Sequence, residues 1–198
     1  MHFHAEIWIP EKLKIGSKQL NSKIEDIMLP YYEGNCEEFD EDTVPPLTFF
    51  DWYSIGGRWT GVHDKYNPYK DPANEEVCFI CNGSGDRPGW VTYNINNERV
   101  FVDDWAKRCN GCNVCHGTGI DHVHPTDFKP HAGDIIAISK LPNDFNCYTL
   151  IVGTDVFMSE GIFSLTENQE GVFNGKVKEK LDELEIKTGY LVTVDYHN

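Results

Sequence analysis

A short cysteine and glycine motif occurs twice in this chain, and it constrains the fold more than any other feature. Cys78 and Cys81 begin the first copy, Cys112 and Cys115 begin the second, and both copies read CxxCxGxG. The two-residue gap lets both sulfurs of a tight turn face one metal ion, and four thiolates close a tetrahedral shell around Zn²⁺. The glycines permit the positive φ that such a turn needs. The chain is therefore predicted to hold one structural Zn²⁺ with these four sulfurs.

The doublet resembles the cysteine-rich zinc domain of DnaJ-type chaperones, which carries four such repeats and two zinc ions. By this resemblance two repeats supply one zinc ion, and nothing in the chain resembles a J-domain. The second pair has an alternative, because Cys109 and Cys112 form an overlapping CxxC, and His116 offers a nitrogen ligand. The glycines follow Cys115, so Cys112 and Cys115 are preferred, with Cys109 as the substitute.

Composition favours a globular protein of a reducing compartment. The chain has 198 residues, of which 40% are hydrophobic, enough for one domain with a sizeable insertion. Seven cysteines, an odd number arranged as CxxC pairs, favour metal over a disulfide framework. No apolar run approaches the ~20 residues of a membrane helix, and the N-terminal segment lacks the features of a signal peptide. We therefore expect a cytoplasmic protein with no membrane contact.

Negative charge is a second constraint. Seventeen basic residues against 32 acidic residues give a formal net charge of −15, which disfavours direct binding of nucleic acid. Five acids gather in one short run, namely Glu37, Glu38, Asp40, Glu41 and Asp42. Such a run is either a solvated acidic loop or a surface that docks on a basic partner by charge complementarity.

The two ends of the chain carry the periodicities of an α+β domain. Strand, helix, strand, strand, helix and strand are expected over residues 3–9, 17–28, 134–140, 148–152, 173–184 and 190–197. The third and fourth elements are expected to form a hairpin. The order βαββαβ is that of the ferredoxin-like fold, an antiparallel sheet with two helices on one face, in which the first and last strands pair.

This reading divides the chain into a core and an insertion. The ferredoxin-like core comprises residues 1–30 and 132–198. The insertion consists of an acidic loop and aromatic segment (31–75), a zinc module with a central β-hairpin (76–120) and a linker (121–131).

The segment DWYSIGGRWTG, residues 51–61, is too aromatic for an ordinary loop and too rich in glycine for a strand. It resembles a motif in uncharacterised proteins of bacteriophages, which also tend to begin and end on alternating strands. The resemblance implies a phage-encoded protein in the host cytoplasm and names no activity. Trp52, Arg58 and Trp59 either clamp an anion or a flat group, or hold the insertion against the sheet, and the second role is favoured.

Polar side chains of the first and last strands form another candidate site. His2 and His4 share one face of the first strand, and Asp195 and His197 share one face of the last. Imidazoles and carboxylates at this spacing can bind a transition metal with open positions for hydrolysis. More often they make a wettable sheet face.

Three functional hypotheses follow. The sequence contains no GxSxG, P-loop, dinucleotide fingerprint or HExxH motif, which favours a binding protein over an enzyme. The leading hypothesis is a zinc-stabilised, non-enzymatic phage-type protein that docks on a host protein with a basic surface. Its role would be to inhibit a host defence complex, for example a nucleic-acid-binding complex of the CRISPR type. The second is a metal-dependent hydrolase at His2, His4, Asp195 and His197. The third is single-stranded nucleic-acid binding by the zinc module, with bases stacked on Trp90, Tyr93, Phe101 and Trp105, which the charge disfavours.

Overall fold

The computed structural model describes residues 1–35, 48–86, 90–96, 98–102, 111–159 and 173–198. The chain forms two compact units. The first unit comprises residues 1–67 and 130–198, and the second comprises residues 68–129. All four cysteines of the repeated motif belong to the second unit.

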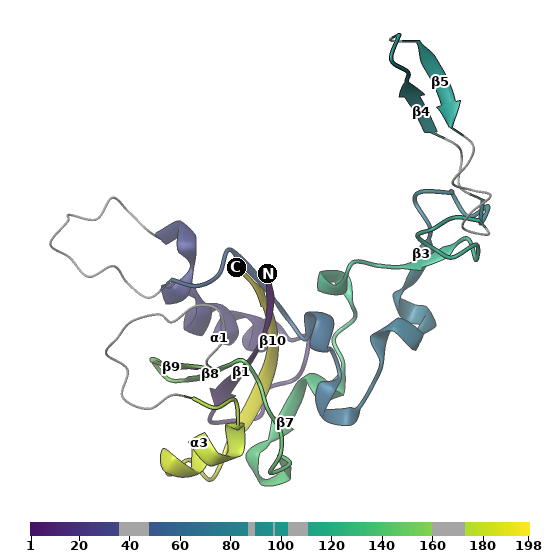
Figure 1. Ribbon diagram of the computed structural model, residues 1–198. Coiled ribbons are helices and arrows are strands. Elements are labelled where there is room, and N and C mark those ends of the chain that lie inside the picture. The colour runs from purple at the N-terminus through teal and green to yellow at the C-terminus, as the bar shows by residue number, and fades with distance from the viewer. Residues whose placement is uncertain (36–47, 87–89, 97, 103–110, 160–172) are drawn as a thin grey trace, which may run out of the picture. The chain divides into compact units, whose positions relative to one another are not determined.

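A mixed sheet forms the core of the first unit (Figure 1). Its strands are β1 (His2–Ile9), β2 (Trp52–Ile55), β7 (Ile135–Ala137), β8 (Thr149–Val152), β9 (Asp155–Met158) and β10 (Tyr190–His197). The strand order is β2-β10-β1-β8-β9, and β7 also pairs with β10. The central strands β1 and β10 pair antiparallel along their whole length, from His2 opposite His197 to Ile9 opposite Tyr190. The expected pairing of the first and last strands is therefore confirmed.

The remaining strands differ from the expected antiparallel sheet. β8 lies directly beside β1 and runs parallel to it, so the ferredoxin-like arrangement is not confirmed. The expected hairpin between residues 134–140 and 148–152 is wrong, because β7 pairs with β10 while β8 pairs with β9. Gly153 explains the second pairing. Its φ of 61° permits the two-residue turn that joins Val152 to Asp155.

Among the residues that the structure describes, two α-helices cover the sheet, α1 (Lys18–Met28) and α3 (Val177–Glu183). The Ser17 hydroxyl caps α1 by accepting a hydrogen bond from the Leu20 N–H at 3.2 Å. Short 3₁₀ helices occupy the connections Leu29–Tyr31, Glu33–Asn35, Gly57–Trp59, Val62–Asp64, Pro68–Lys70, Pro72–Asn74, Pro125–Asp127, Ala132–Asp134 and Ile138–Lys140. No helix in the described ranges is both long enough and apolar enough to cross a membrane.

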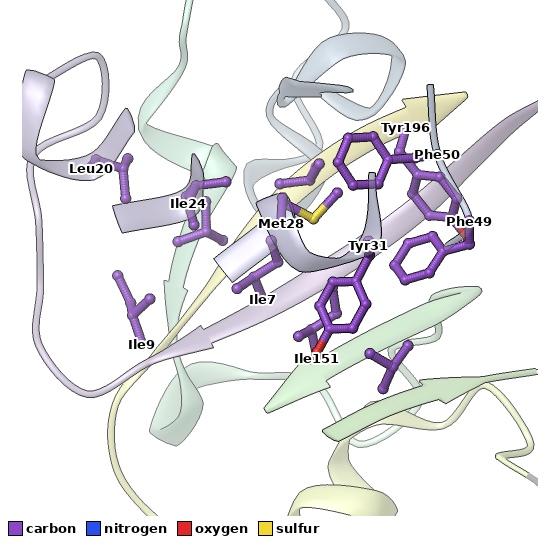
Figure 2. Packing of buried hydrophobic residues seen from close by; sticks show 14 residues of the cluster. Ile7, Ile9, Leu20, Ile24, Met28, Tyr31, Phe49, Phe50, Ile151 and Tyr196 are labelled. Atoms are coloured by element: carbon purple, nitrogen blue, oxygen red, sulfur yellow. The ribbon is translucent and has the colours of Figure 1, made fainter. Parts of the chain in front are cut away.

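Each face of the sheet has its own apolar cluster. Leu20, Ile24 and Met28 of α1 are fully buried and pack with Ile7 of β1 and with a group of aromatic rings (Figure 2). Figure 2 labels these rings as Tyr31, Phe49, Phe50 and Tyr196.

The second cluster forms on the opposite face. Val177 and Leu181 of α3 pack with Leu150 of β8 and Leu191 of β10. Because consecutive residues of a strand point to opposite faces, α1 and α3 lie on opposite sides of the sheet. The expectation of two helices on one face is therefore wrong. α3 covers only part of its face, and the polar side chains of β1 and β10 occupy the rest.

The described part of the second unit contains two short antiparallel strand pairs. β3 (Glu75–Val77) pairs with β6 (Ile120–His122), and β4 (Trp90–Tyr93) pairs with β5 (Arg99–Val102). The first pair closes the chain around the two cysteine motifs, because β3 ends immediately before Cys78 and β6 begins immediately after Gly119.

Candidate metal centre

Four cysteine sulfurs meet in the second unit. The side chains of Cys78, Cys81, Cys112 and Cys115 are buried, and their Sγ atoms all lie within 4.8 Å of one another. The Cys78 and Cys112 sulfurs are 3.8 Å apart, and the Cys81 and Cys115 sulfurs are 3.7 Å apart. A tetrahedron with Zn–S bonds of about 2.3 Å has edges of about 3.8 Å. The two closest sulfur pairs therefore have the spacing that a zinc ion requires.

The two cysteine motifs fold as two copies of the same turn. In each copy the first, second and fourth residues after the second cysteine have positive φ, which is 49°, 82° and 76° after Cys81 and 52°, 84° and 79° after Cys115. The third residue, Ser84 or Thr118, donates its hydroxyl to the carbonyl of that cysteine, at 2.8 and 2.7 Å. The repeated sequence thus produces a repeated backbone conformation.

The last glycine of each turn joins it to the other turn. The carbonyl of Gly85 accepts a hydrogen bond from the Cys112 N–H at 2.6 Å, and the carbonyl of Gly119 accepts one from the Cys78 N–H at 3.0 Å. A Cβ atom on Gly85 would lie 2.4 Å from the carbonyl oxygen of Gly117, and one on Gly119 would lie 2.3 Å from that of Gly83. Both distances are far below van der Waals contact. Side chains here would push the turns, and with them the sulfurs, apart.

The surroundings of the sulfurs shift the pKa values of Cys78 and Cys115 in opposite directions. Burial raises the pKa of Cys78 to about 11. Burial opposes ionisation of Cys115 as well, but hydrogen bonds from the Gly119 backbone and from the neighbouring thiols lower its pKa to about 6. The Gly119 N–H lies 3.2 Å from the Cys115 sulfur. Four thiolates at this spacing repel one another, so a divalent cation is the charge that would allow all four to ionise.

The four cysteines that the sequence analysis preferred as zinc ligands are the four that the structure brings together. His116 is exposed and is not part of the cluster. Cys109 falls in 103–110, outside the described residues, as does Trp105. Glu37, Glu38, Asp40, Glu41 and Asp42, the acidic run, fall in 36–47 and are likewise outside the described residues.

The second candidate site does not converge on one point. Its residues form three separate pairs, namely His2 with Asp195 at 3.2 Å, His4 with Glu6 at 2.8 Å and His197 with Asp51 at 2.9 Å. Within the described ranges, the four cysteines are the only group of three or more His, Cys, Asp or Glu side chains that lies close enough to hold one metal ion. The strand pairing thus places these histidines on one face without assembling a metal site.

The DWYSIGGRWTG segment covers this polar face of the sheet. β2 pairs with β10, and the backbone N–H of Arg58 donates to the Asp195 carboxylate at 3.1 Å. The Trp52 ring stacks on His197 with centroids 5.8 Å apart, and the Trp59 ring stacks on His4 at 5.3 Å. These contacts hold the segment against the sheet.

Glycine is required where this segment approaches β10. Gly57 has a φ of 54°, and a Cβ atom on it would lie 2.4 Å from the Cβ atom of Asp195. Gly57 therefore allows the segment to pack closely on β10.

Glu6 lies on the same polar face of β1 as His4, and its partner His63 was not identified from the sequence. Glu6 is fully buried, and its Oε1 accepts a hydrogen bond from the Thr193 hydroxyl at 2.9 Å. His63 Nε2 lies 3.3 Å from the same carboxylate. Burial would raise the pKa of Glu6, but hydrogen bonds with His4 and His63 lower it to about 2. Fifty-seven residues separate Glu6 from His63, so no local pattern marks the pair.

Comparison with known proteins identifies no relative of this chain. No protein-family model, curated protein or solved structure matches this chain. The functional assignment therefore rests on the residues of the chain itself.

Proposed function

We propose that the protein is a zinc-stabilised, non-enzymatic binding protein that docks on a partner protein with a basic surface. The cluster of four buried sulfurs is the observation that carries this proposal. Four sulfurs fill the coordination shell of Zn²⁺ and leave no position for a substrate, so the ion would stabilise the second unit rather than catalyse a reaction.

Charge supports a basic partner. The net charge of −15 gives the surface a field that attracts cationic proteins and repels phosphate backbones. By the resemblance to bacteriophage proteins, the partner would be a host protein, with inhibition of a nucleic-acid-binding defence complex as the role. The basic surfaces of such complexes match this charge.

Exposed apolar side chains beside the sulfur cluster support a docking role. Val77, Phe79 and Ile120 are 61%, 71% and 42% exposed, and Val77 lies opposite Ile120 in the β3–β6 pair. The residue that corresponds to Phe79 in the second motif is Asn113, so the turn itself does not need an aromatic ring there. Large exposed apolar residues that folding does not explain are typical of interaction surfaces.

The zinc part is tested by elemental analysis of the purified protein. The wild-type chain is expected to contain one Zn²⁺, and Cys78→Ser/Cys81→Ser none. Cys147→Ser is the control, because Cys147 is buried in the other unit and is expected to leave the zinc content unchanged. Absence of zinc from the wild-type protein, or one equivalent of zinc in the double variant, would contradict the assignment.

The docking part is tested by association kinetics with a partner identified from host lysate by affinity capture. Replacing the five acids of the 37–42 run by their amides is expected to slow association and flatten its salt dependence. Phe79→Asn is expected to speed dissociation. The control replaces four acids of the α3 region, Glu179, Asp182, Glu183 and Glu185, by amides. Equal effects from the two acidic sets would show that only the overall charge matters and would refute a defined docking surface.

A further inference from the structure

A cavity of about 1060 Å³ lies in the first unit, separate from the metal centre. Its walls come from the connection after β1, from β7 and the turn that follows it, from the first residue of β10, and from His63. Figure 1 shows β7 beside the N-terminal end of β10, with which it pairs. The volume is just above the range of about 300–1,000 Å³ that is typical of sites for small organic ligands.

Positive charge gathers at this cavity in an otherwise acidic unit. Residues 1–67 and 130–198 contain 23 acidic and 11 basic residues, and three of those eleven, Lys12, Lys14 and Lys140, line the cavity. Asp64 is the one acid among the lining residues, and it lies 3.9 Å from His131. Exposed lysine ammonium groups act as mobile point charges that suit phosphate oxygens. The local charge is thus opposite to that of the unit as a whole.

Apolar side chains line the same cavity between the lysines. Leu13 and Ile15 alternate with Lys12 and Lys14 along the connection after β1, and all four lie on the cavity wall. Tyr190 adds a half-buried aromatic ring. A ligand that used the whole cavity would therefore carry both an anionic group and an apolar or aromatic body.

His63 adds a buried polar group to the wall of the cavity. Its side chain is 2% exposed, and its Nε2 lies 3.2 Å from the Thr193 hydroxyl in addition to its contact with Glu6. Its Nδ1 is buried and has no hydrogen-bond partner in the described part of the chain. Buried nitrogens are rarely left without a partner in folded proteins. A ligand hydrogen bond to this nitrogen would require the His63 ring to turn towards the cavity, because the atom has no accessible surface in the structure.

We propose that this cavity binds a small organic phosphate of the size of a nucleotide. The lysines would hold the phosphate oxygens, and Tyr190 with the aliphatic wall would hold the base. The long-range field of the acidic unit opposes this ligand, but it is screened beyond about 8 Å at physiological ionic strength, whereas the lysines act at contact. The proposal does not depend on the docking function or on the zinc ion.

Calorimetric titration of the full zinc-loaded chain tests the site, with ATP, adenosine and inorganic pyrophosphate as probes. ATP is expected to bind saturably with a stoichiometry of one, and adenosine at least tenfold more weakly. Lys12→Glu/Lys14→Glu is expected to weaken ATP binding at least tenfold. Lys18→Glu/Lys23→Glu on α1 carries the same charge change outside the cavity and is expected to change the affinity less than twofold.

Two further variants keep the test decisive. Lys140→Glu tests the charge from another segment of the wall if the first double variant does not fold. Tyr190→Leu is expected to weaken ATP binding at least threefold and to leave pyrophosphate binding unchanged. Absence of saturable ATP binding, or equal losses in the two lysine pairs, would overturn the proposal. Tighter binding of a glutamate-rich peptide than of ATP, through the same lysines, would also overturn it and assign the cavity to an acidic protein segment.

Discussion

The two units of this protein are held together in different ways. The first unit buries aliphatic and aromatic side chains on both faces of a sheet, and no single residue dominates either cluster. Over residues 68–86, 94–96, 98 and 111–129 of the second unit, the buried hydrophobic residues are the four cysteines and Phe128. Among the same described residues, only Ile80 and Val114 pack beside the cysteines as partly buried apolar residues. The second unit thus lacks, over those residues, the apolar core that stabilises the first.

This difference determines how each unit is expected to lose its stability. Each fully buried aliphatic side chain in the first unit contributes about 1.5–3 kcal/mol, so the stabilisation is spread over many residues. A structural zinc ion contributes about 10 kcal/mol or more at one point. The first unit should therefore lose stability in small steps, and the second should lose it all at once with its metal.

Removal of zinc is the largest expected effect and would break the comparison most directly. A strong chelator is expected to abolish hydrogen-exchange protection at the Cys78 and Cys112 amides, because their hydrogen bonds to Gly119 and Gly85 depend on the sulfurs staying together. Amides of β1 and β10 should keep their protection. Hydrogen exchange followed by mass spectrometry measures both units in one experiment. Simultaneous loss of protection in both units would show that they share one source of stability.

A cavity in the apolar core is the reciprocal change. Ile24 is fully buried between α1 and the sheet, so Ile24→Ala is expected to lower the unfolding free energy of the first unit by about 2–5 kcal/mol. The zinc content should stay at one ion. Urea unfolding and elemental analysis check the two outcomes. Lys23→Ala, at the neighbouring exposed position, is the control and should change stability by less than about 0.5 kcal/mol.

The buried carboxylate Glu6 gives the first unit a pH dependence that apolar packing alone would not. Its pKa is lowered to about 2 in the folded protein from an ordinary value of 4.5. The folded state therefore gains stability above the ordinary pKa and loses it as the pH falls from about 4.5 towards about 2, with a total on the order of 3 kcal/mol.

Glu6→Gln tests this dependence. It should lower the unfolding free energy at pH 7 by about 3 kcal/mol, and the difference from wild type should shrink across the same acidic range. Denaturant titrations at several pH values provide the measurement. Glu25→Gln, a matched change at an exposed position of α1, should show no such convergence. A difference that stays constant down to pH 2 would assign the effect to shape rather than charge.

Local chemistry explains what the sequence could predict. The cysteine cluster follows from spacing and turn chemistry within eight-residue segments, so both copies could be placed from their residues alone. The alternation over residues 3–9 and 190–197 likewise indicated the two central strands, which do pair. In each case the information lies in neighbouring residues.

Long-range packing explains what the sequence could not predict. β7 pairs with β10 rather than with β8, although β8 is nearer in sequence. α3 has the apolar stripe of a helix, but its stripe does not encode which face of the sheet it covers. His63 joins Glu6 only because the segment after β2 folds back over the sheet. These features depend on the competition between whole elements for the same surface, which local periodicity does not contain.

Two glycines with the same backbone requirement give the finest comparison between the units. Gly119 and Gly153 have φ values of 79° and 61°, so alanine at either position carries a conformational cost of about 1 kcal/mol. Nothing lies within 4 Å of a Cβ atom built on Gly153, whereas one on Gly119 would lie 2.3 Å from the Gly83 carbonyl oxygen. Gly153→Ala should therefore lower the stability of the first unit by that cost alone.

Gly119→Ala should instead act on the metal. The Cβ atom would separate the two turns and the sulfur pairs that they carry, so zinc affinity is expected to fall at least tenfold while the first unit keeps its stability. Competition with a chromogenic chelator measures the affinity, and urea unfolding measures the stability. Unchanged zinc affinity in Gly119→Ala would mean that the turns can separate without moving the sulfurs, and the metal centre would then depend on its cysteines alone. A tenfold loss would show that the glycine contacts and the four sulfurs act as one structure, in contrast to the independent side chains of the sheet.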